Sequence, residues 1–250
     1  ALVATSGGRL APTVEAAGGR IISMPVASKN PVAMIANAHL LRQLIEREGV
    51  DLIHARSRAP AWSALFAARG AGVPLVTTYH GAYNGGLAIK RFYNSSMVRG
   101  DLVIANSNFT ASSIRAAYPN VRRLAVIPRG ADTQEFNPSA ISSSRISAMR
   151  EKWRLVENPA QLVLLLPARL TAWKGHEIAL AAASKLNAAG VFPPFQLVFV
   201  GGVQGRGEFA ALLARRIVEL GLQQVVQTVG HCDDMPAAYA LADFVLSPST

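Results

Sequence analysis

The sequence predicts an α/β fold of two doubly wound, Rossmann-like parallel-sheet domains that face each other across a crevice, and three observations support this. Short apolar segments alternate with helix-like segments along the whole 250 residues, which is typical of a parallel sheet with helices on both faces. A polar stretch rich in proline and serine, 137–144, interrupts this alternation. Half of the residues are apolar, which is enough to fill two cores.

Six strands are predicted in the first half of the chain, where aliphatic residues gather in short runs. They are expected at 1–5, 20–24, 51–54, 75–79, 101–105 and 124–127. Asn30 and Pro31 supply an N-cap and a first-turn proline for a helix that continues to Gly49. Ser107 caps a second helix, which Pro119 ends.

The second half repeats the alternation after a domain boundary. Four strands are expected, at 162–166, 196–200, 225–228 and 244–246, with a helix at 176–190. Asp233 and Asp234 open a helix that runs to Ala242, and Asp243 is expected to mark the turn into the last strand. The expected organisation is a first domain at 1–137, a linker with a basic helix at 138–158, and a second domain at 159–250.

Composition narrows the classes of function. The longest apolar runs are far shorter than the roughly 20 residues that cross a bilayer. The single cysteine, Cys232, excludes an internal disulfide framework and a cysteine-rich zinc site, and it suits a reducing compartment. A cytoplasmic protein is therefore expected. The sequence opens within an apparent strand and ends in a loop that follows one, so we expect a fragment of a longer protein.

The net charge of +10 is distributed unevenly. Residues 1–137 carry 15 Lys/Arg against 7 Asp/Glu, whereas residues 138–250 carry 10 against 8. Aromatic residues do not interleave with the basic ones, which argues against a nucleic-acid partner. An anionic membrane surface or a lipid-phosphate acceptor fits better, and general solubility explains the charge equally well.

Polar residues follow the predicted strands of the first half. His54, Arg56 and Arg58 lie at the end of one strand, and His80 follows another. Each histidine alone is more simply explained as a satisfied polar residue. Because strand ends of a parallel sheet share one edge, the two together favour a functional site. Residues 130–132 (GAD) fit either a ligand-facing turn or an Asx turn.

The stretch 162–176 contains the strongest local signal. A strand of branched aliphatics leads into a loop that carries Arg169 and Lys174 just before a helix. The N-terminus of a helix disfavours cations and attracts anions, so this pair predicts a phosphate or diphosphate that neutralises both charges. The alternative is an exposed pair that reaches back to a carboxylate.

Glycines follow the next strand of the second half. Gly201 and Gly202 would allow a ligand to approach the backbone closely. The run 205–210 fits G-x-G-x-x-A, but it begins some residues past the strand end, and no acid ends the following strand. A dinucleotide site is therefore disfavoured. The sequence has no metal-ligand cluster and no G-x-S-x-G elbow of a hydrolase.

Four segments, in this order, resemble the retaining glycosyltransferases of family 4 (GT4), which have the two-domain GT-B fold. They are 126–138 (VIPRGADTQEFNP), 168–175 (ARLTAWKG), 199–202 (FVGG) and the spaced residues of 230–249 that end in LSPS. Segments 78–81 (TYHG) and 105–110 (ANSNFT) are also similar to the first domain of that family.

The resemblance implies a hexosyltransferase-type enzyme that moves a sugar, with retention, from a nucleoside-diphosphate-sugar donor to a glycan or lipid-linked acceptor. Lipopolysaccharide or cell-envelope glycan synthesis is the implied setting. Neither a cofactor nor an obligatory metal is implied. Peripheral association with the cytoplasmic membrane face fits such an acceptor.

The resemblance also implies roles for residues of the second domain. Arg169 and Lys174 correspond to the catalytic cations that hold the donor diphosphate and stabilise it as it leaves. Five further residues lie on the donor side: the pair Gly201 and Gly202 near the nucleotide, and the base-reading segment Gly230, His231 and Cys232.

In the first domain, His80 corresponds to a histidine near the transferred sugar and the acceptor. We expect His54, Arg56 and Arg58 on the acceptor side. Arg129 replaces the asparagine usual in the family motif. The family's first glycine-rich loop and its paired glutamates match nothing in this sequence, so the fragment alone is expected to be inactive or only weakly nucleotide-binding.

Two other classes of function remain open. A sugar-nucleotide epimerase would share the two-domain GT-B architecture, and a sugar- or nucleotide-binding module would share the fold without the chemistry. The ordered motifs favour the transferase. A nicotinamide-dependent oxidoreductase is less well supported still.

Overall fold

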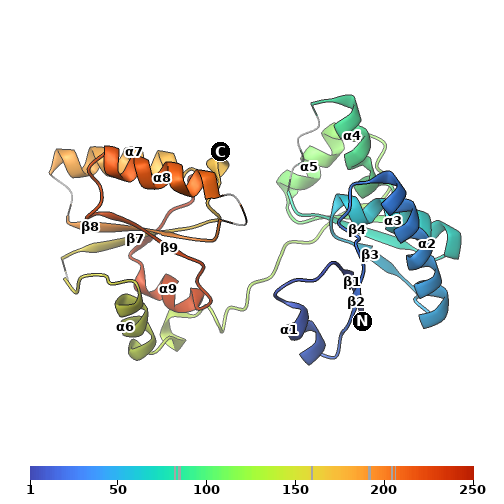
Figure 1. Ribbon diagram of the computed structural model, residues 1–250, viewed down its shortest axis with the longest axis horizontal. Coiled ribbons are helices and arrows are strands. Elements are labelled where there is room, and N and C mark those ends of the chain that lie inside the picture. Colours follow the sequence, from blue (N-terminus) through green and yellow to red (C-terminus); the bar gives the residue numbers. More distant parts are fainter. Residues whose placement is uncertain (82, 84–85, 159, 191–192, 204, 206) are drawn as a thin grey trace. The chain divides into compact units, whose positions relative to one another are not determined.

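The computed structural model describes residues 1–81, 83, 86–158, 160–190, 193–203, 205 and 207–250. The chain forms two compact units, which we call unit 1 (Ala1–Gly130) and unit 2 (Ala131–Thr250) (Figure 1). Every sheet in both units is parallel, which confirms the predicted α/β class. The division falls seven residues before the predicted boundary at 137, and residues 138–158 belong to unit 2.

The strands of unit 1 form two sheets. Strands β1 (Leu2–Thr5) and β2 (Arg20–Ser23) pair with each other. The other four lie in the order β3-β4-β5-β6, and they are β3 (Ile53–Ala55), β4 (Leu75–Tyr79), β5 (Leu102–Ala105) and β6 (Leu124–Val126). All six lie within two residues of their predicted positions, but the pattern alone did not reveal the separation into two sheets.

The helices of unit 1 connect these strands. They are α1 (Ala11–Ala16), α2 (Pro31–Glu48), α3 (Arg58–Ala71), α4 (Ala88–Asn94), the 3-10 turn η1 (Ser95–Val98) and α5 (Asn108–Ala117). Both predicted caps are confirmed: Asn30 Oδ1 accepts from the Val32 N–H at 2.9 Å, and Ser107 Oγ accepts from the Thr110 N–H at 3.1 Å. These contacts satisfy N–H groups that the first helical turn leaves unpaired.

The buried core of unit 1 lies on one face of the four-stranded sheet. Leu75 and Tyr79 of β4 and Val103 of β5 point into it, where they meet helices α3 and α5 and the turn η1. Residues of the opposite face, such as Val76 and Ile104, are only half-buried. The second buried layer expected of a doubly wound sheet is thus not part of the described core of unit 1.

Unit 2 contains one sheet in the order β10-β7-β8-β9. Its strands are β7 (Leu162–Pro167), β8 (Phe195–Val200), β9 (Val226–Gly230) and β10 (Phe244–Val245). Its helices are η2 (Pro138–Ala140), α6 (Ser143–Lys152), η3 (Ala172–Lys174), α7 (His176–Ala189), α8 (Gly207–Glu219) and α9 (Met235–Leu241).

Both faces of the sheet of unit 2 are covered, as Figure 1 shows. Val163 and Leu165 of β7 face the layer of α6 and α9, whereas Leu164 and Leu166 face the layer of α7 and α8. Burial on both faces explains why β7 is apolar without interruption, because neither set of alternating side chains meets water.

The predicted basic linker helix is part of this packing. Met149 of α6 and Trp153, which follows it, are buried in the core that α6 shares with α9. Arg145 donates from Nη2 to Asp234 Oδ1 at 2.7 Å and from Nε to Asp234 Oδ2 at 3.1 Å. Asp234 Oδ1 also accepts from the Ala237 N–H, so this acid caps α9 as predicted.

Each unit contains an aspartate that joins two strands in the same way. Asp243 accepts the Val163 N–H at 2.7 Å through Oδ2 and donates its own N–H to the Val163 carbonyl at 2.9 Å. In unit 1, Asp101 makes the equivalent pair with Leu75, both at 2.8 Å. Asp243 therefore marks the turn into the last strand, as predicted.

The helices among the described residues are all either too short or too polar to cross a bilayer.

Candidate functional site

In unit 2, the loops that follow the four strands meet at one edge of the sheet. The Gly201 N–H donates to the Gly230 carbonyl at 2.7 Å, and the Ala168 N–H donates to the Val200 carbonyl at 2.8 Å. The Thr250 N–H donates to the Trp173 carbonyl at 3.0 Å. Backbone hydrogen bonds thus connect all four loops, and they fix the edge where parallel-sheet proteins bind ligands.

Arg169 and Lys174 lie together in the loop after β7. The Lys174 Nζ is 4.2 Å from the centroid of the Trp173 ring, and the Arg169 Cζ is 5.7 Å from the same centroid. Lys174 Nζ also reaches Ser249 Oγ at 3.5 Å. The predicted pair is therefore brought to one aromatic side chain, which attracts cations through its face.

Two glycines allow these loops to approach each other closely. A Cβ at Gly175 would lie 2.1 Å from the Pro248 carbonyl oxygen, and Gly175 has a left-handed φ of 75°. A Cβ at Gly201 would lie 2.0 Å from the Ala168 carbonyl oxygen. Both positions exclude any larger residue. Gly202, by contrast, has open space around it, which leaves room beside the loop.

The segment Gly230, His231 and Cys232 divides its side chains between surface and core. Cys232 is buried in the core beneath α6 and α9, and burial raises the pKa of its thiol. Only its backbone is therefore placed to contact a ligand. His231 is exposed, and its Nε2 lies 3.0 Å from Asp233 Oδ1. The G-x-G-x-x-A run includes Arg206, which lies outside the described residues.

A buried histidine begins helix α7 directly behind the Arg169 and Lys174 loop. His176 is fully buried, and its ring meets Phe199 edge-on at 5.0 Å between centroids. Backbone groups of Ala168 and Thr171 lie beside the ring. Burial lowers the pKa of His176, so the imidazole is neutral at pH 7.

In unit 1, His80 follows the carboxyl end of β4, as predicted, whereas His54 is the middle residue of the neighbouring strand β3. His54 Nε2 lies 2.7 Å from Thr78 Oγ1, and His80 Nδ1 lies 2.6 Å from Arg129 Nη2. Because a guanidinium only donates, His80 Nδ1 must be the acceptor, and its proton is on Nε2. Asn106 Nδ2 donates to the His80 carbonyl at 3.2 Å and ties this strand end to the next.

Positive charge surrounds these two histidines. Burial and the charge of Arg129 lower the pKa of His80, with smaller contributions from Arg56 and His54. Burial and the charge of Arg56 lower the pKa of His54. The edge therefore combines neutral imidazoles with cations, which suits hydroxyl-bearing or anionic groups.

Arg58 does not join this group. Its Nη1 donates to Asn94 Oδ1 at 2.9 Å, and its Cζ lies 4.6 Å from the centroid of the Tyr83 ring. These contacts tie the start of α3 to the end of α4. Asp132 likewise accepts two backbone N–H groups, from Gln134 and Glu135, which confirms the Asx-turn interpretation of its segment.

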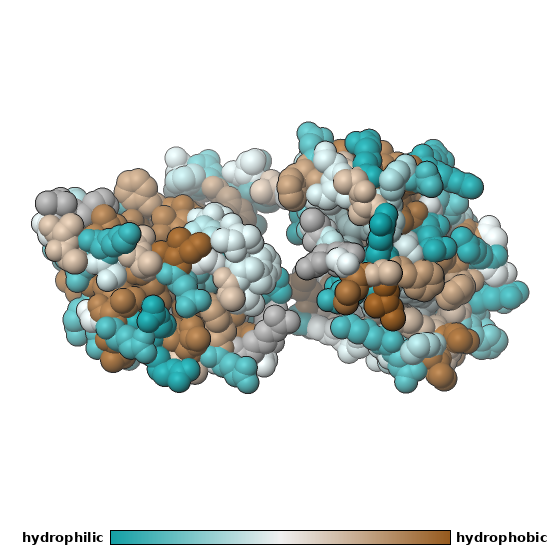
Figure 2. Space-filling view, turned by 90° about the horizontal axis from the view of Figure 1, so that it is seen from above, coloured by the Kyte–Doolittle hydropathy of each residue, from teal (hydrophilic) through white to brown (hydrophobic). Residues whose placement is uncertain are grey.

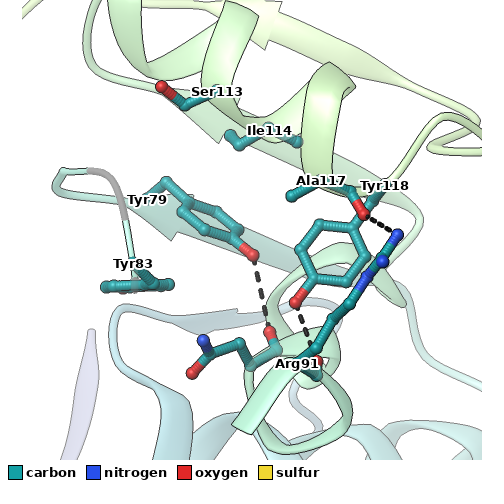
Figure 3. A pocket seen from close by; sticks show the side chains of 8 residues that line it. Tyr79, Tyr83, Arg91, Ser113, Ile114, Ala117 and Tyr118 are labelled. Atoms are coloured by element: carbon teal, nitrogen blue, oxygen red, sulfur yellow. Dashed lines mark hydrogen bonds between the residues drawn. The ribbon is translucent and has the colours of Figure 1, made fainter. Parts of the chain in front are cut away.

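Unit 1 also contains a cavity of about 220 Å³ that is lined by tyrosines and was not predicted (Figure 3). One of its lining residues, Tyr79, directly precedes His80 in the sequence. Tyr79, the last residue of β4, points into it between α4 and α5. Tyr118 donates from its hydroxyl to the Arg91 carbonyl at 2.8 Å, and Arg91 Nη2 donates to the Ala117 carbonyl at 2.6 Å. The sequence held one signal for this cavity, a tyrosine at a strand end followed by the histidine.

The described residues contain no cluster of three or more His, Cys, Asp or Glu side chains that could hold a metal ion.

Comparison with known proteins identifies both parts of the chain. Residues 1–135 match the family described as Glycosyltransferase Family 4, and residues 148–250 match Glycosyl transferases group 1. No curated protein sequence matches the chain.

Solved structures with the same fold cover nearly all of the chain. A glycosyltransferase from Rickettsia africae ESF-5 is 32% identical, with a TM-score of 0.83 over 99% of this chain and 64% of that one. HepE from Anabaena, in complex with UDP and glucose, is 23% identical, with a TM-score of 0.82 over 99% and 66%. WaaG, a glycosyltransferase of lipopolysaccharide biosynthesis, is 16% identical, with a TM-score of 0.70 over 99% and 66%.

These likenesses confirm the predicted GT-B-like fold. The chain spans between 64% and 66% of the length of these three structures.

Proposed function

Since the chain belongs to Glycosyltransferase Family 4, as its match over residues 1–135 shows, we propose that it takes part in retaining hexosyl transfer. The donor is a nucleoside-diphosphate sugar, and the acceptor is a glycan or a lipid-linked glycan. The observation that carries the proposal is the pair Arg169 and Lys174, gathered on Trp173 at the carboxyl edge of a parallel sheet.

In this proposal, unit 2 binds the donor. The two cations bind the diphosphate, and their charge stabilises it as the bond between sugar and phosphate breaks. Gly202, with open space around it, admits the nucleotide near the backbone, and the backbone of 230–232 reads the base. The HepE structure holds UDP and glucose, which makes UDP-glucose the first donor to test.

Unit 1 then binds the acceptor. The acceptor hydroxyl forms the new bond to the sugar as the bond between sugar and phosphate breaks, and its proton passes to an oxygen of the departing nucleoside diphosphate. His80 carries its proton on Nε2, so it can donate a hydrogen bond to a sugar oxygen. Burial and the charge of Arg129 lower the pKa of the imidazole, and the hydrogen bond from Arg129 holds this tautomer. No step requires a metal, because Arg169 and Lys174 supply the positive charge.

A lipid-linked acceptor at the cytoplasmic membrane face is supported by the surface of α4. Leu87, Ile89 and Phe92 are 59%, 76% and 61% exposed, and Lys90 and Arg91 lie between them in the sequence. Figure 2 shows the side of unit 1 on which α4 and α5 lie, where hydrophobic and hydrophilic side chains are mixed. Apolar side chains flanked by cations suit the interface of an anionic membrane.

The donor part of the proposal is tested by calorimetric titration of the full-length protein with UDP, GDP and ADP. We expect one nucleotide to bind and the variant Arg169→Ala/Lys174→Ala to lose that binding. The matched control, Lys185→Ala/Arg215→Ala, removes two exposed cations from helices α7 and α8 and should bind as the unsubstituted chain does. If the three nucleotides all fail to bind, or if the double variant binds normally, the donor site is not where we propose.

The epimerase alternative is separated by product analysis of the full-length protein. A transferase releases nucleoside diphosphate only as sugar appears on an acceptor. Donor that is converted with no acceptor present would favour an epimerase instead.

A further inference from the structure

The largest cavity described in unit 1 lies at the amino ends of its strands. It has a volume of about 890 Å³, and its walls include the residues that directly precede β4, β5 and β6, namely Pro74, Asp101 and Arg123. His80 and Asn106 follow the opposite, carboxyl ends of β4 and β5. The length of β4, about 13 Å, separates the two edges. The cavity is therefore distinct from the candidate site.

Four arginines line this cavity: Arg69, Arg99, Arg122 and Arg123. They come from the end of α3, from the residue after η1, and from the loop before β6. Within the described part of the chain, none of the four makes an ion pair with a carboxylate.

One acid lines the cavity against four arginines, so the formal charge of its walls remains +3. Asp101 is the one acid among the described lining residues, and its carboxylate accepts the Leu75 N–H at 2.8 Å. Arg99 donates from Nε to Ser95 Oγ at 3.0 Å, and its Cζ lies 5.5 Å from the Trp62 ring centroid. A hydroxyl and an aromatic face hold that guanidinium in place, but neither carries a formal negative charge.

From this arrangement we propose that the cavity is a binding site for phosphate groups. Cations that converge on one concave surface repel each other, and a multivalent anion removes that cost. The planar fork of guanidinium donors matches the oxygens of phosphate. The Asn120 side chain, which also lines the cavity, adds uncharged hydrogen-bonding capacity.

The site is independent of the proposed transfer reaction, because it shares no residue with the Arg169 loop or with the His80 edge. Its ligand is either a soluble phosphate compound or the headgroup of an anionic lipid. Both sources present the same chemistry to the arginines, so the experiment must separate them.

The test uses the chain with Arg169→Ala/Lys174→Ala as its background, so that the candidate donor site cannot contribute. Inorganic pyrophosphate is titrated by calorimetry, and co-sedimentation is measured with phosphatidylcholine vesicles that contain or lack phosphatidylglycerol. The variant is Arg122→Gln/Arg123→Gln, whose exposed side chains make no hydrogen bond within the described part of the chain. The control, Lys29→Gln/Arg115→Gln, removes the same charge from the same unit outside the cavity.

We expect pyrophosphate to bind, and to bind at least about tenfold more weakly in the cavity variant than in the control, because two charge-assisted contacts are lost. Vesicle binding without pyrophosphate binding, reduced in the same variant alone, would identify the lipid headgroup as the source. The proposal is overturned if neither probe binds, or if the cavity variant and the control lose binding equally. Unchanged melting temperatures would show that both variants remain folded.

Discussion

The two units use the same parallel architecture but place their polar chemistry differently. In unit 2 both faces of the sheet are buried, so β7 is continuously apolar and Arg169 and Lys174 must lie in loops beyond the strands. In unit 1 the core lies on one face, and the other face carries Thr78 and His54 on the strands themselves. The number of buried faces thus decides whether a strand can carry functional side chains.

Charge follows the same division. Unit 1 holds 15 Lys/Arg and 5 Asp/Glu, whereas unit 2 holds 10 of each. The whole net charge of +10 therefore belongs to unit 1. Such a difference concerns partners rather than fold, because net charge influences association and solubility more than topology.

The largest effect is expected from substitutions of the glycines that allow the loops of unit 2 to approach each other closely. Gly201→Ala places a methyl group 2.0 Å from the Ala168 carbonyl oxygen, so the free energy of unfolding of unit 2 should fall by about 2–4 kcal/mol. Nucleotide binding should be lost as well. Chemical denaturation, monitored through hydrogen exchange of the backbone amides of β7 and β8, measures the change in stability.

Gly202→Ala is the matched control for that variant, because its Cβ would meet open space. It should change the stability of unit 2 by less than about 0.5 kcal/mol. Equal losses in both variants would mean that the close approach at Gly201 does not control the loops.

The aspartate shared by both units offers a direct comparison between them. Asp101→Ala and Asp243→Ala each leave one strand N–H without its acceptor, which should cost about 1–2 kcal/mol in the unit concerned. Asp→Asn at either position keeps an acceptor oxygen and should recover most of the loss. Hydrogen exchange of Leu75 and Val163 reports each unit separately, and a loss confined to one unit would refute their equivalence.

The buried His176 should make the stability of unit 2 depend on pH. Burial lowers its pKa below the ordinary value of 6.5, so the unfolded chain binds the proton more readily than the folded one. Its contribution is complete above pH 6.5 and is lost as pH falls through the lowered pKa. Denaturation between pH 8 and pH 5 should show this loss for the unsubstituted chain and a flatter profile for His176→Leu.

Added salt should have the smallest effect on the free energy of unfolding, and this effect should be confined to unit 1. Screening relieves repulsion among its excess cations, so added salt should stabilise unit 1 by a few tenths of a kcal/mol, about the size of exposed charge effects. Unit 2, with balanced charge, should not respond. Hydrogen exchange of β4 and β8 at low and high salt compares them, and an equal response would contradict the role of charge.

Much of the fold was predictable, because the strands are runs of apolar residues that are clearly more hydrophobic than the segments around them. The run at Leu162–Pro167, the cap at Asn30 and the aspartates at the start of α9 carry local signals that do not depend on tertiary contacts. The separation of β1 and β2 from the second sheet was not predictable, since pairing between strands depends on contacts distant in sequence.

The candidate site likewise contains residues that carry a local sequence signal and residues that do not. Glycines mark the loops of unit 2 in the sequence, because the close approach of the backbone at Gly175 and Gly201 requires them there. The contact between His80 and Arg129 joins residues 49 positions apart, and no local pattern indicates it. The contacts of Arg58 with Asn94 and Tyr83 were not predictable for the same reason, since these partners come from other segments.

The reactivity of the single thiol, Cys232, measures local opening of unit 2. The side chain is 4% exposed and its pKa is raised, so both shielding and a low thiolate population should slow its reaction with disulfide reagents. Because the sequence contains one cysteine, each modified molecule records one opening event beneath α6 and α9. The rate of thiol modification, measured with and without nucleotide, would therefore report how often this core opens, and no engineered probe is needed.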